Sequence, residues 1–409
     1  LSHNETTPNA MAITEVLVQQ EADTTTEEEE ENVIQLRYFV AAHERSAVER
    51  ISGALRGVAK CAPLRVTNPL SADLIWLNTP LKSLRAACSA AKSYNHLTGA
   101  TVLENKAKLA FVQERMAVPT LESYALEVER EACRRGFFEQ EREGSSVSDS
   151  DSDETELVSL ALPPGRWVLK DATANSAAGL WFVDIAKEGA DSSATSLNSQ
   201  KKSESATVTT TTVVAQRYLQ NPLLWQSRKL QYRVYAVFKA RGECHLYAGA
   251  MLQVCAKPYD PESCEDRAKC VTNVAANHDE PTFVPERPIF DLREFEPERY
   301  AKIRTLIASL AAAAAPFLLA SKSDHFQLAG LDVLFDDSDS NNAWLVEVNC
   351  PPNNFGSSVT GPIEQFHLDL ATAALERFVL FRCRANDDPP SKNKWDRVFP
   401  GLRRHDDDE

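Results

Sequence analysis

The sequence lacks the residue patterns that mark zinc centres and secreted disulfide scaffolds. Its nine cysteines are odd in number and include no Cys-x-x-Cys pair, and none of the eight histidines belongs to a His-Glu-x-x-His motif. These absences argue against a zinc site and favour reduced thiols in a cytosolic compartment. The stretch ALRGVAK, residues 54–60, holds a lone glycine, which cannot by itself support a dinucleotide-binding fold.

Positive charge and long apolar runs are also scarce. The 44 lysines and arginines against 59 aspartates and glutamates leave a net charge of −15, and no basic tract stands out. This balance disfavours nucleic acid and anionic membranes as partners, so an acidic partner would have to meet a local basic patch. The stretch 307–320 is too short to span a bilayer and holds Ser309 and Pro316, so it predicts a core helix. We expect no signal peptide before Met11.

What is present is a chain that can build a large core. With 409 residues, of which 43% are hydrophobic and 25% charged, we expect two or three packed subdomains. AKLAFVQERM (107–116) has the spacing of an amphipathic helix, whereas RWVLKD (166–171) and QYRVYAVFKA (231–240) are apolar with β-branched or aromatic residues. This mixture predicts an α/β or α+β fold built on antiparallel sheets.

Composition shifts divide the chain into segments. Residues 1–32 are polar and end in a glutamate run, which predicts a disordered acidic tail. Two low-complexity stretches, near 144–156 and at 188–212, predict surface insertions, because neither can bury enough apolar area to offset its ordering entropy. We therefore expect an N-terminal α/β subdomain, a central subdomain that carries both insertions, a C-terminal subdomain and a polar tail, in that order at 33–100, 101–220, 221–385 and 386–409.

Two stretches near the carboxyl end predict a β-hairpin. GLDVLFD (330–336) and AWLVEVN (343–349) flank a polar turn, DSDSNN. A symmetric loop makes one apolar face from three facing pairs, which are Phe335 with Trp344, Val333 with Val346, and Leu331 with Val348. The other face then carries Asp332 opposite Glu347, with Asn349 two residues further along.

Facing carboxylates are destabilising without a compensating cation. Mg²⁺ binds one or two carboxylates together with phosphate oxygens and water, so Asp332, Glu347 and Asn349 predict a nucleotide-bound Mg²⁺ site. The alternative is that Asp332 and Glu347 face solvent on the outside of a half-buried sheet, because any such strand alternates in this way.

Several blocks in the same order carry a wider resemblance. The chain resembles the tubulin-tyrosine ligase family, a branch of the ATP-grasp enzymes, in the hairpin and in the blocks YNHLTGATVLENKAKLAFVQ, PTLESYAL, WVLKDATANSAAGLWFV, VVAQRYLQNPLLWQSRKLQYRVYAVF and KPYDPESCEDRAKCVTN. The resemblance spans about residues 94–354 and implies an ATP-grasp fold with central and C-terminal ATP-grasp subdomains. It implies ATP and Mg²⁺ as cofactors, bound in the cleft between those two subdomains.

The resemblance assigns nucleotide contacts to five residues. Lys170 would contact the α- and β-phosphates, and Lys229 would contact the nucleotide. At the hinge, Tyr218 and Leu219 would offer an N–H and a C=O to adenine, while Gln216 flanks the ring. The alternatives are a snorkelling surface lysine for Lys170 and plain core packing for the hinge.

Further roles follow from the same blocks. Arg233 would meet the γ-phosphate or the substrate carboxylate, and its position four residues after Lys229 places two like charges on one strand face, which requires an anion. Lys106 would lie near the nucleotide, with solvation on a helix surface as the alternative. Thr272 and Asn273 would lie beside the substrate, with a simple turn as the alternative.

The implied reaction joins a carboxylate and an amine at the expense of ATP. A carboxylate attacks the γ-phosphorus, Lys170 and Arg233 stabilise the transferring phosphoryl group, and an amino acid's α-amine then attacks the acyl phosphate. We expect the acidic C-terminal tail of tubulin as acceptor and a free amino acid as co-substrate, with tyrosine favoured over glutamate by the short layout and the ESY block. No nucleic-acid or membrane partner is expected, and the location is expected to be cytoplasmic, in association with microtubules.

Three departures from the family pattern keep other functions open. Gln231 replaces a carboxylate near the nucleotide, Gln253 replaces an arginine beside the reacting carboxylate, and the phosphate loop has only Gly179 where relatives have several glycines. The chain could therefore be a nucleotide-binding or tubulin-binding module that has lost ligation. A third hypothesis is an ATP-grasp ligase that acts on another acidic polypeptide or on a small amino acid.

Overall fold

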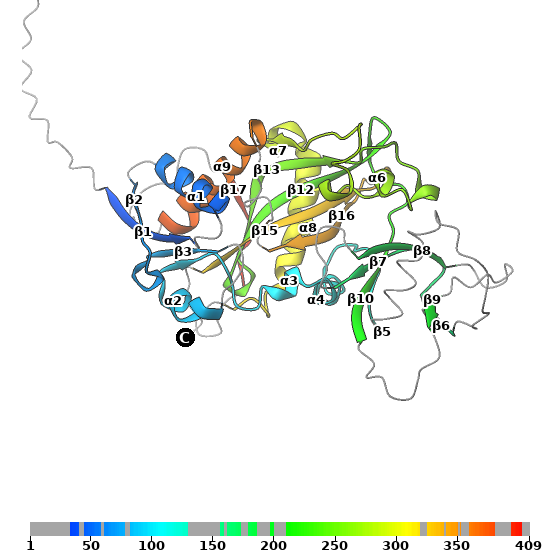
Figure 1. Ribbon diagram of the computed structural model, residues 1–409, viewed down its shortest axis with the longest axis horizontal. Coiled ribbons are helices and arrows are strands. Elements are labelled where there is room, and N and C mark those ends of the chain that lie inside the picture. The colour runs from blue at the N-terminus through cyan, green and yellow to red at the C-terminus, as the bar shows by residue number, and fades with distance from the viewer. Residues whose placement is uncertain are drawn as a thin grey trace, which may run out of the picture.

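The computed structural model describes the folded parts of the chain. These are residues 33–40, 45–58, 61–77, 82–129, 156–158, 162–172, 179–185, 197–199, 210–319, 325–338, 341–350, 352, 360–380 and 394–402. The predicted tail 1–32, most of the two predicted insertions, residues 173–178 of the phosphate loop and most of 386–409 lie outside the described residues. Figure 1 shows a small parallel sheet at one end of the molecule, a large sheet in the middle and a third sheet at the other end.

The N-terminal sheet is parallel and has the order β2-β1-β3-β4. Its strands are β1 (Ile34–Val40), β2 (Cys61–Arg65), β3 (Leu74–Trp76) and β4 (Ser93–Tyr94), with helices α1 (Arg45–Gly57) and α2 (Arg85–Ala90) between them. Leu36, Tyr38 and Val40 alternate along β1 and pack with Ile51 and Leu55 of α1, because side chains two apart share one face of a strand. This alternation gives the small sheet a buried face, whose core also includes Tyr235 and Phe326 of the C-terminal sheet.

The sheet of the predicted central subdomain, called the central sheet from here on, lies at the opposite end of the molecule from the N-terminal sheet in Figure 1. It is antiparallel and has the order β5-β10-β7-β8. Its strands are β5 (Ser123–Glu129), β7 (Gly165–Asp171), β8 (Leu180–Ile185) and β10 (Thr210–Arg217), preceded by helices α3 (Thr101–Glu104) and α4 (Lys106–Gln113). Trp167, Leu169, Val213 and Ala215 form its core. A separate pair, β6 (Glu156–Val158) and β9 (Leu197–Ser199), is also antiparallel, so β9 and the start of β10 fall inside the stretch 188–212 that predicts an insertion.

The C-terminal sheet is the largest of the described sheets. It has the order β14-β13-β12-β15-β16, with β11 beside β12 and β17 beside β13. Its strands are β11 (Leu224–Trp225), β12 (Arg228–Lys239), β13 (Cys244–Val254), β14 (Arg287–Ile289), β15 (Phe326–Phe335), β16 (Ala343–Asn349) and β17 (Trp395–Phe399). All their pairings are antiparallel.

Two helices cover the two faces of this sheet. α8 (Pro297–Ala314) buries Ile303, Ile307 and Leu310 against one face, and α9 (Pro362–Leu375) packs with α1 on the other. The remaining helices are short: α6 (Arg267–Cys270), α7 (Leu292–Phe295), the 3-10 turns Pro69–Ser71, Lys82–Leu84, Ala240–Gly242, Pro261–Ser263 and Val274–Ala276, and the π-helical turn Glu376–Leu380. The predicted core helix is thus confirmed as far as Ala314, just before Pro316, which cannot continue a helix. In the part of the chain that the structure describes, no helix is both long and apolar enough to span a bilayer.

Strand β12 explains why polar side chains collect in the middle of the molecule. Leu230, Tyr232 and Val234 point into the core under α8, so the intervening Lys229, Gln231 and Arg233 share the opposite face. All of these side chains are buried. The mixed α+β architecture with several antiparallel sheets confirms the predicted fold class, whereas the subdomain boundaries remain a prediction.

Candidate active site

A cleft lies between the central and the C-terminal sheets. Its volume is about 850 Å³, including its open mouth. Eleven of the residues predicted to form a site line it: Lys106, Lys170, Gln216, Tyr218, Leu219, Lys229, Gln231, Thr272, Asn273, Asp332 and Glu347. Arg233, Gln253 and Asn349 do not line the cleft but lie on the strands directly behind it.

Lys170 projects from β7 into this cleft. Trp167 and Leu169 point into the core of the central sheet, so Lys170 and Val168 face the other way. The ammonium donates to Oε1 of Gln216 at 2.7 Å and to the carbonyl oxygen of Val346 at 3.3 Å. Burial lowers the pKa of Lys170 to about 8, and the nearby Glu347 opposes that shift. Lys170 is therefore a buried cation held by two neutral oxygens.

Lys229 is a second buried cation with neutral partners. Its ammonium donates to the carbonyl oxygen of Cys270 at 3.0 Å and to the hydroxyl of Tyr218 at 3.4 Å, and it lies 4.5 Å from the centre of the Tyr218 ring. Burial, together with a smaller effect of Lys170, lowers its pKa to about 8. The two lysines approach the cleft from different sheets, which suits an anion bound between the sheets.

The predicted hairpin is present, with one correction to its register. Asp332 pairs with Glu347 and Leu331 with Val348, as predicted. Val333 pairs with Leu345 instead of Val346, and Phe335 pairs with Ala343 instead of Trp344. A β-bulge between Asp332 and Val333 in the register causes both errors, because β16 carries one extra residue, Val346, at that point.

The bulge has a consequence for the cleft. Leu345 and Val348 both belong to the core, three residues apart, and Glu347 still faces Asp332. The carbonyl oxygen of Val346 accepts a hydrogen bond from Lys170. Through this hydrogen bond, the bulge residue Val346 links the C-terminal sheet to the central sheet across the cleft.

Asp332, on the wall of the cleft, is paired with Arg233, which lies behind that wall. The two residues are register partners on β15 and β12, and the guanidinium holds both carboxylate oxygens, with Nη2 at 2.9 Å from Oδ2 and Nε on Oδ1. Each side chain is 6% exposed. The pKa of the Asp332 carboxyl is raised, chiefly by burial and also by the nearby Glu347, and the ion pair with Arg233 offsets part of that rise. The carboxylate is therefore fixed in place by a rigid fork.

Glu347 and Asn349 complete the predicted ligand set. The Lys106 ammonium lies 3.5 Å from Oε1 of Glu347. The amide nitrogen of Asn349 is buried and has no hydrogen-bond partner among the described residues, although such groups are normally paired. Over those same residues, no cluster of three His, Cys, Asp or Glu side chains could hold a metal, so a cation here would need Asn349 as its third ligand.

The two glutamines form a chain of hydrogen bonds across the strands. They are register partners on β12 and β13, and the Gln231 amide donates to Oε1 of Gln253 at 2.8 Å. Thr272 donates to Oε1 of Gln231 at 2.8 Å, and Gln253 donates to Glu286 at 2.5 Å. The chain thus leads from Thr272 on the cleft wall to Glu286, a carboxylate that the sequence analysis did not identify.

The hinge lies at the end of β10. The Gln216 side chain accepts from Lys170 and donates to the Ser123 hydroxyl at 3.3 Å. The N–H of Tyr218 donates to the carbonyl oxygen of Arg166 at 3.0 Å, so an N–H offered to a base at this hinge has to come from Leu219. The carboxamide oxygen of Asn273 caps a 3-10 turn by accepting from the Ala275 N–H at 2.9 Å.

Apolar residues that the sequence analysis did not identify complete the cleft. They come from several elements and suit the flat face of a base: Leu121, Val168, Leu180, Phe182, Val271 and Leu334. Their spacing within strands is that of ordinary core residues, so only the fold reveals them.

One cysteine prediction is wrong. Cys264 and Cys270 form a disulfide next to the cleft, although the sequence favours reduced thiols throughout. The two lie on consecutive short turns, one ending at Ser263 and the other spanning Arg267–Cys270, which bring their sulfurs together. The other described cysteines, which are Cys61, Cys88, Cys244, Cys255 and Cys350, are not part of this disulfide.

The geometry and a comparison with known proteins agree. The cleft combines two buried lysines, an apolar wall and a pair of facing carboxylates, as the resemblance of the sequence implies. The model of the tubulin-tyrosine ligase family matches residues 85–376, which is more than half of the chain. The chain belongs to the tubulin-tyrosine ligase family.

Proposed function

We propose that this protein is an ATP-dependent ligase that joins the α-amine of an amino acid to a carboxylate of a polypeptide through an acyl phosphate. Membership of the family supports a ligase-type, ATP-binding enzyme that acts on a tubulin-like substrate. The single observation that carries the proposal is Asp332 facing Glu347 in a cleft that two buried lysines also enter. We place the activity in the cytoplasm, in association with microtubules.

The cleft residues fit a magnesium nucleotide. The apolar wall with Val168, Phe182 and Leu334 would take the base, and Lys170 and Lys229 would take phosphate oxygens. Asp332, Glu347 and Asn349 would hold Mg²⁺, which supplies neutralisation of phosphate charge when it is bound. The unpartnered Asn349 amide supports this fit, because a buried amide normally has a partner. Since Asn349 lies behind the lining of the cleft, its side chain would turn toward Glu347 to reach the cation.

The chain's own residues would act mainly by positioning. Arg233 orients Asp332 through two hydrogen bonds, so a contact between Arg233 and the acceptor carboxylate requires one of those bonds to open. Lys170 carries its charge toward the transferring phosphoryl group, where a preorganised cation in a water-poor site is most effective. Thr272 and Asn273 line the cleft where we place the acceptor and the amino acid.

The Gln231 and Gln253 departures amount to one paired change. They face each other and share a hydrogen bond, so a carboxylate and an arginine are replaced together by two neutral amides. The summed charge at this place is unchanged, and no buried charge is left alone. This compensation favours retained ligation over the alternative of a nucleotide-binding or tubulin-binding module, although the acyl phosphate loses one cation.

Incorporation of a labelled amino acid tests the proposal. Purified protein is incubated with tubulin, Mg-ATP and labelled tyrosine or glutamate, with tubulin lacking its C-terminal tail as the matched control substrate. We expect label on intact tubulin, with tyrosine preferred, and none on the truncated control. No incorporation despite measurable ATP binding would favour the module, and label on another acidic polypeptide alone would replace tubulin as acceptor.

Nucleotide binding should depend on pH through the two buried lysines. Both have a pKa of about 8 without ligand, so each is protonated below that value and loses its charge as the pH rises through it. ATP affinity should therefore fall between pH 7 and pH 9, by about tenfold for each lysine that must be charged. Equilibrium binding at constant ionic strength measures it. Lys170→Arg, which stays charged, should remove about half of the decline in ATP affinity on a logarithmic scale. An ATP affinity that does not change with pH in the unmodified protein would contradict the assignment of the two lysines to the phosphates.

A further inference from the structure

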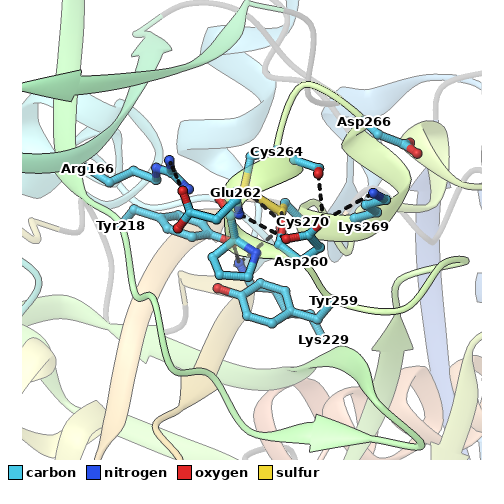
Figure 2. The surroundings of a disulfide bond; sticks show 12 residues. Arg166, Tyr218, Lys229, Tyr259, Asp260, Glu262, Cys264, Asp266, Lys269 and Cys270 are labelled. Carbon is cyan, nitrogen blue, oxygen red and sulfur yellow. Dashed lines mark hydrogen bonds and ion pairs between the residues drawn. A yellow bond between two sulfur atoms is a disulfide. The ribbon is translucent and has the colours of Figure 1, made fainter.

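The disulfide between Cys264 and Cys270 lies in the wall of the cleft. Both residues are almost fully buried and pack in one cluster with Val168 and Tyr218, which line the cleft. Figure 2 shows the disulfide beside Tyr218. Cys270 itself and the three residues after it, Val271, Thr272 and Asn273, also line the cleft. One end of the disulfide, Cys270, is therefore part of the surface that would hold the nucleotide.

Residues 264–273 contact both sheets that border the cleft, the central sheet and the C-terminal sheet. The carbonyl oxygen of Cys270 accepts from the Lys229 ammonium at 3.0 Å, which ties this segment to the C-terminal sheet. The Arg267 guanidinium donates to the carbonyl oxygen of Leu180 at 3.1 Å, which ties it to β8 of the central sheet. A shift of this segment would move a partner of Lys229 and part of the apolar wall together.

Besides the disulfide, hydrogen bonds hold this segment, including those from the Lys257 N–H to the carbonyl oxygen of Ala268 at 3.0 Å and from the Asn277 amide to that of Val271 at 2.7 Å, whereas its helical turn and its exposed ion pairs contribute little. α6 is a single helical turn, and helices of that length are not stable alone. The ion pair between Lys269 and Asp260, at 3.4 Å, joins side chains that are 27% and 42% exposed, and such pairs contribute little. The disulfide closes a short loop of sequence separation six and removes conformations that the reduced segment could adopt.

We propose that thiol–disulfide exchange at Cys264–Cys270 sets the affinity of the cleft for nucleotide, with the disulfide form as the tight-binding one. This inference rests on the proposed function, because it concerns regulation of the same site. A dithiol reductant breaks the S–S bond: two electrons and two protons pass to Cys264 and Cys270, which become thiols, and the dithiol closes to its own disulfide. In the cytosol, where we place the protein, disulfides are usually transient and redox-sensing.

The coupling between nucleotide binding and the redox state of the disulfide is reciprocal. A ligand that binds the disulfide form more tightly must also stabilise the disulfide against reduction, by the same factor. Mg-ATP should therefore shift the dithiol concentration needed for half reduction upward.

Binding measurements in two redox states test the proposal. The full chain is prepared oxidised and after treatment with dithiothreitol, thiols are mapped by alkylation and peptide mass spectrometry, and a fluorescent ATP analogue is titrated into each. We expect the reduced form to bind about tenfold more weakly, within the usual range of coupled sites, and Cys264→Ser to bind like the reduced form in both states. Cys61→Ser, which changes a cysteine of β2 that is not part of the disulfide, is the matched control and should behave like the unmodified chain.

The outcomes separate this inference from the proposed function. Equal affinity in two states whose thiol maps differ would overturn the inference and leave the nucleotide site intact. Alkylation of both Cys264 and Cys270 in the oxidised protein, without prior reduction, would also overturn it. No binding in either state would contradict both the proposed function and this regulation, whereas ligation is not needed for any of these readouts.

Discussion

Replacing Glu347 by glutamine should lower the rate of amino-acid incorporation by at least about 100-fold, the effect typical of losing one preorganised charged group from such a site. The substitution keeps the size of the side chain but removes the negative charge that faces Asp332 and lies 3.5 Å from Lys106. The cleft then offers one carboxylate fewer to Mg²⁺. Initial rates with labelled amino acid at saturating Mg-ATP measure the loss.

The control for this variant lies in the turn of the same hairpin. Asp337 is exposed and follows β15 outside the cleft between the sheets, so Asp337→Asn makes the same chemical change without touching the site. Its rate should stay within about twofold of the unmodified protein, because surface substitutions away from special features change little. Unchanged turnover of Glu347→Gln would refute the metal role of the hairpin.

Removing Arg233 should destabilise the protein by about 3–5 kcal/mol, the usual cost of breaking a buried ion pair from one side. Arg233→Met leaves the Asp332 carboxylate buried, with its fork of two hydrogen bonds gone. The free energy of unfolding from urea titration measures the cost. Lys92→Met is the surface control: it breaks an ion pair with Asp73 at 3.1 Å, but Lys92 is 74% exposed, so the expected cost is about 0–1 kcal/mol.

The same pair allows a double-mutant cycle. Arg233→Met combined with Asp332→Leu removes both charges, so no unpaired ion remains in the interior. The double variant should be less destabilised than the sum of the two single changes, with a coupling energy of at least about 1 kcal/mol. Additive losses would mean that each residue is held by other partners and that Arg233 does not position Asp332.

The sequence predicts the site to the extent that local periodicity controls it. Alternation along β12 places Lys229, Gln231 and Arg233 on one face, and hairpin pairing places Asp332 opposite Glu347; both follow from period two and appear in the structure. The errors in the remaining hairpin pairs have one source. A period-two pattern assumes an unbroken ladder, whereas Val346 is an extra residue, and an apolar residue in a strand carries no mark of a bulge.

Contacts between distant elements could not be predicted in this way. Glu286 is linked to the site by the hydrogen bond from Gln253, and the apolar wall consists of residues from several strands and loops on both sides of the cleft. The pairing of Cys264 with Cys270 depends on how two short turns pack against Tyr218, which their spacing does not disclose. Such features depend on three-dimensional packing that no single stretch of residues encodes.

The neutral partners of the two buried lysines bear on how a strongly acidic protein attracts a polyanion. Lys170 donates to an amide and a backbone carbonyl, and Lys229 to a carbonyl and a phenol, so neither ammonium is bonded to a carboxylate of the described residues. Dipoles hold each ammonium in place, and the nearby carboxylates of Glu347 and Asp332 offset only part of the positive potential of Lys170. Over distances beyond about 8 Å, physiological salt screens the −15 of the whole chain. An incoming triphosphate therefore senses the local field of the pocket walls rather than the sign of the molecule as a whole.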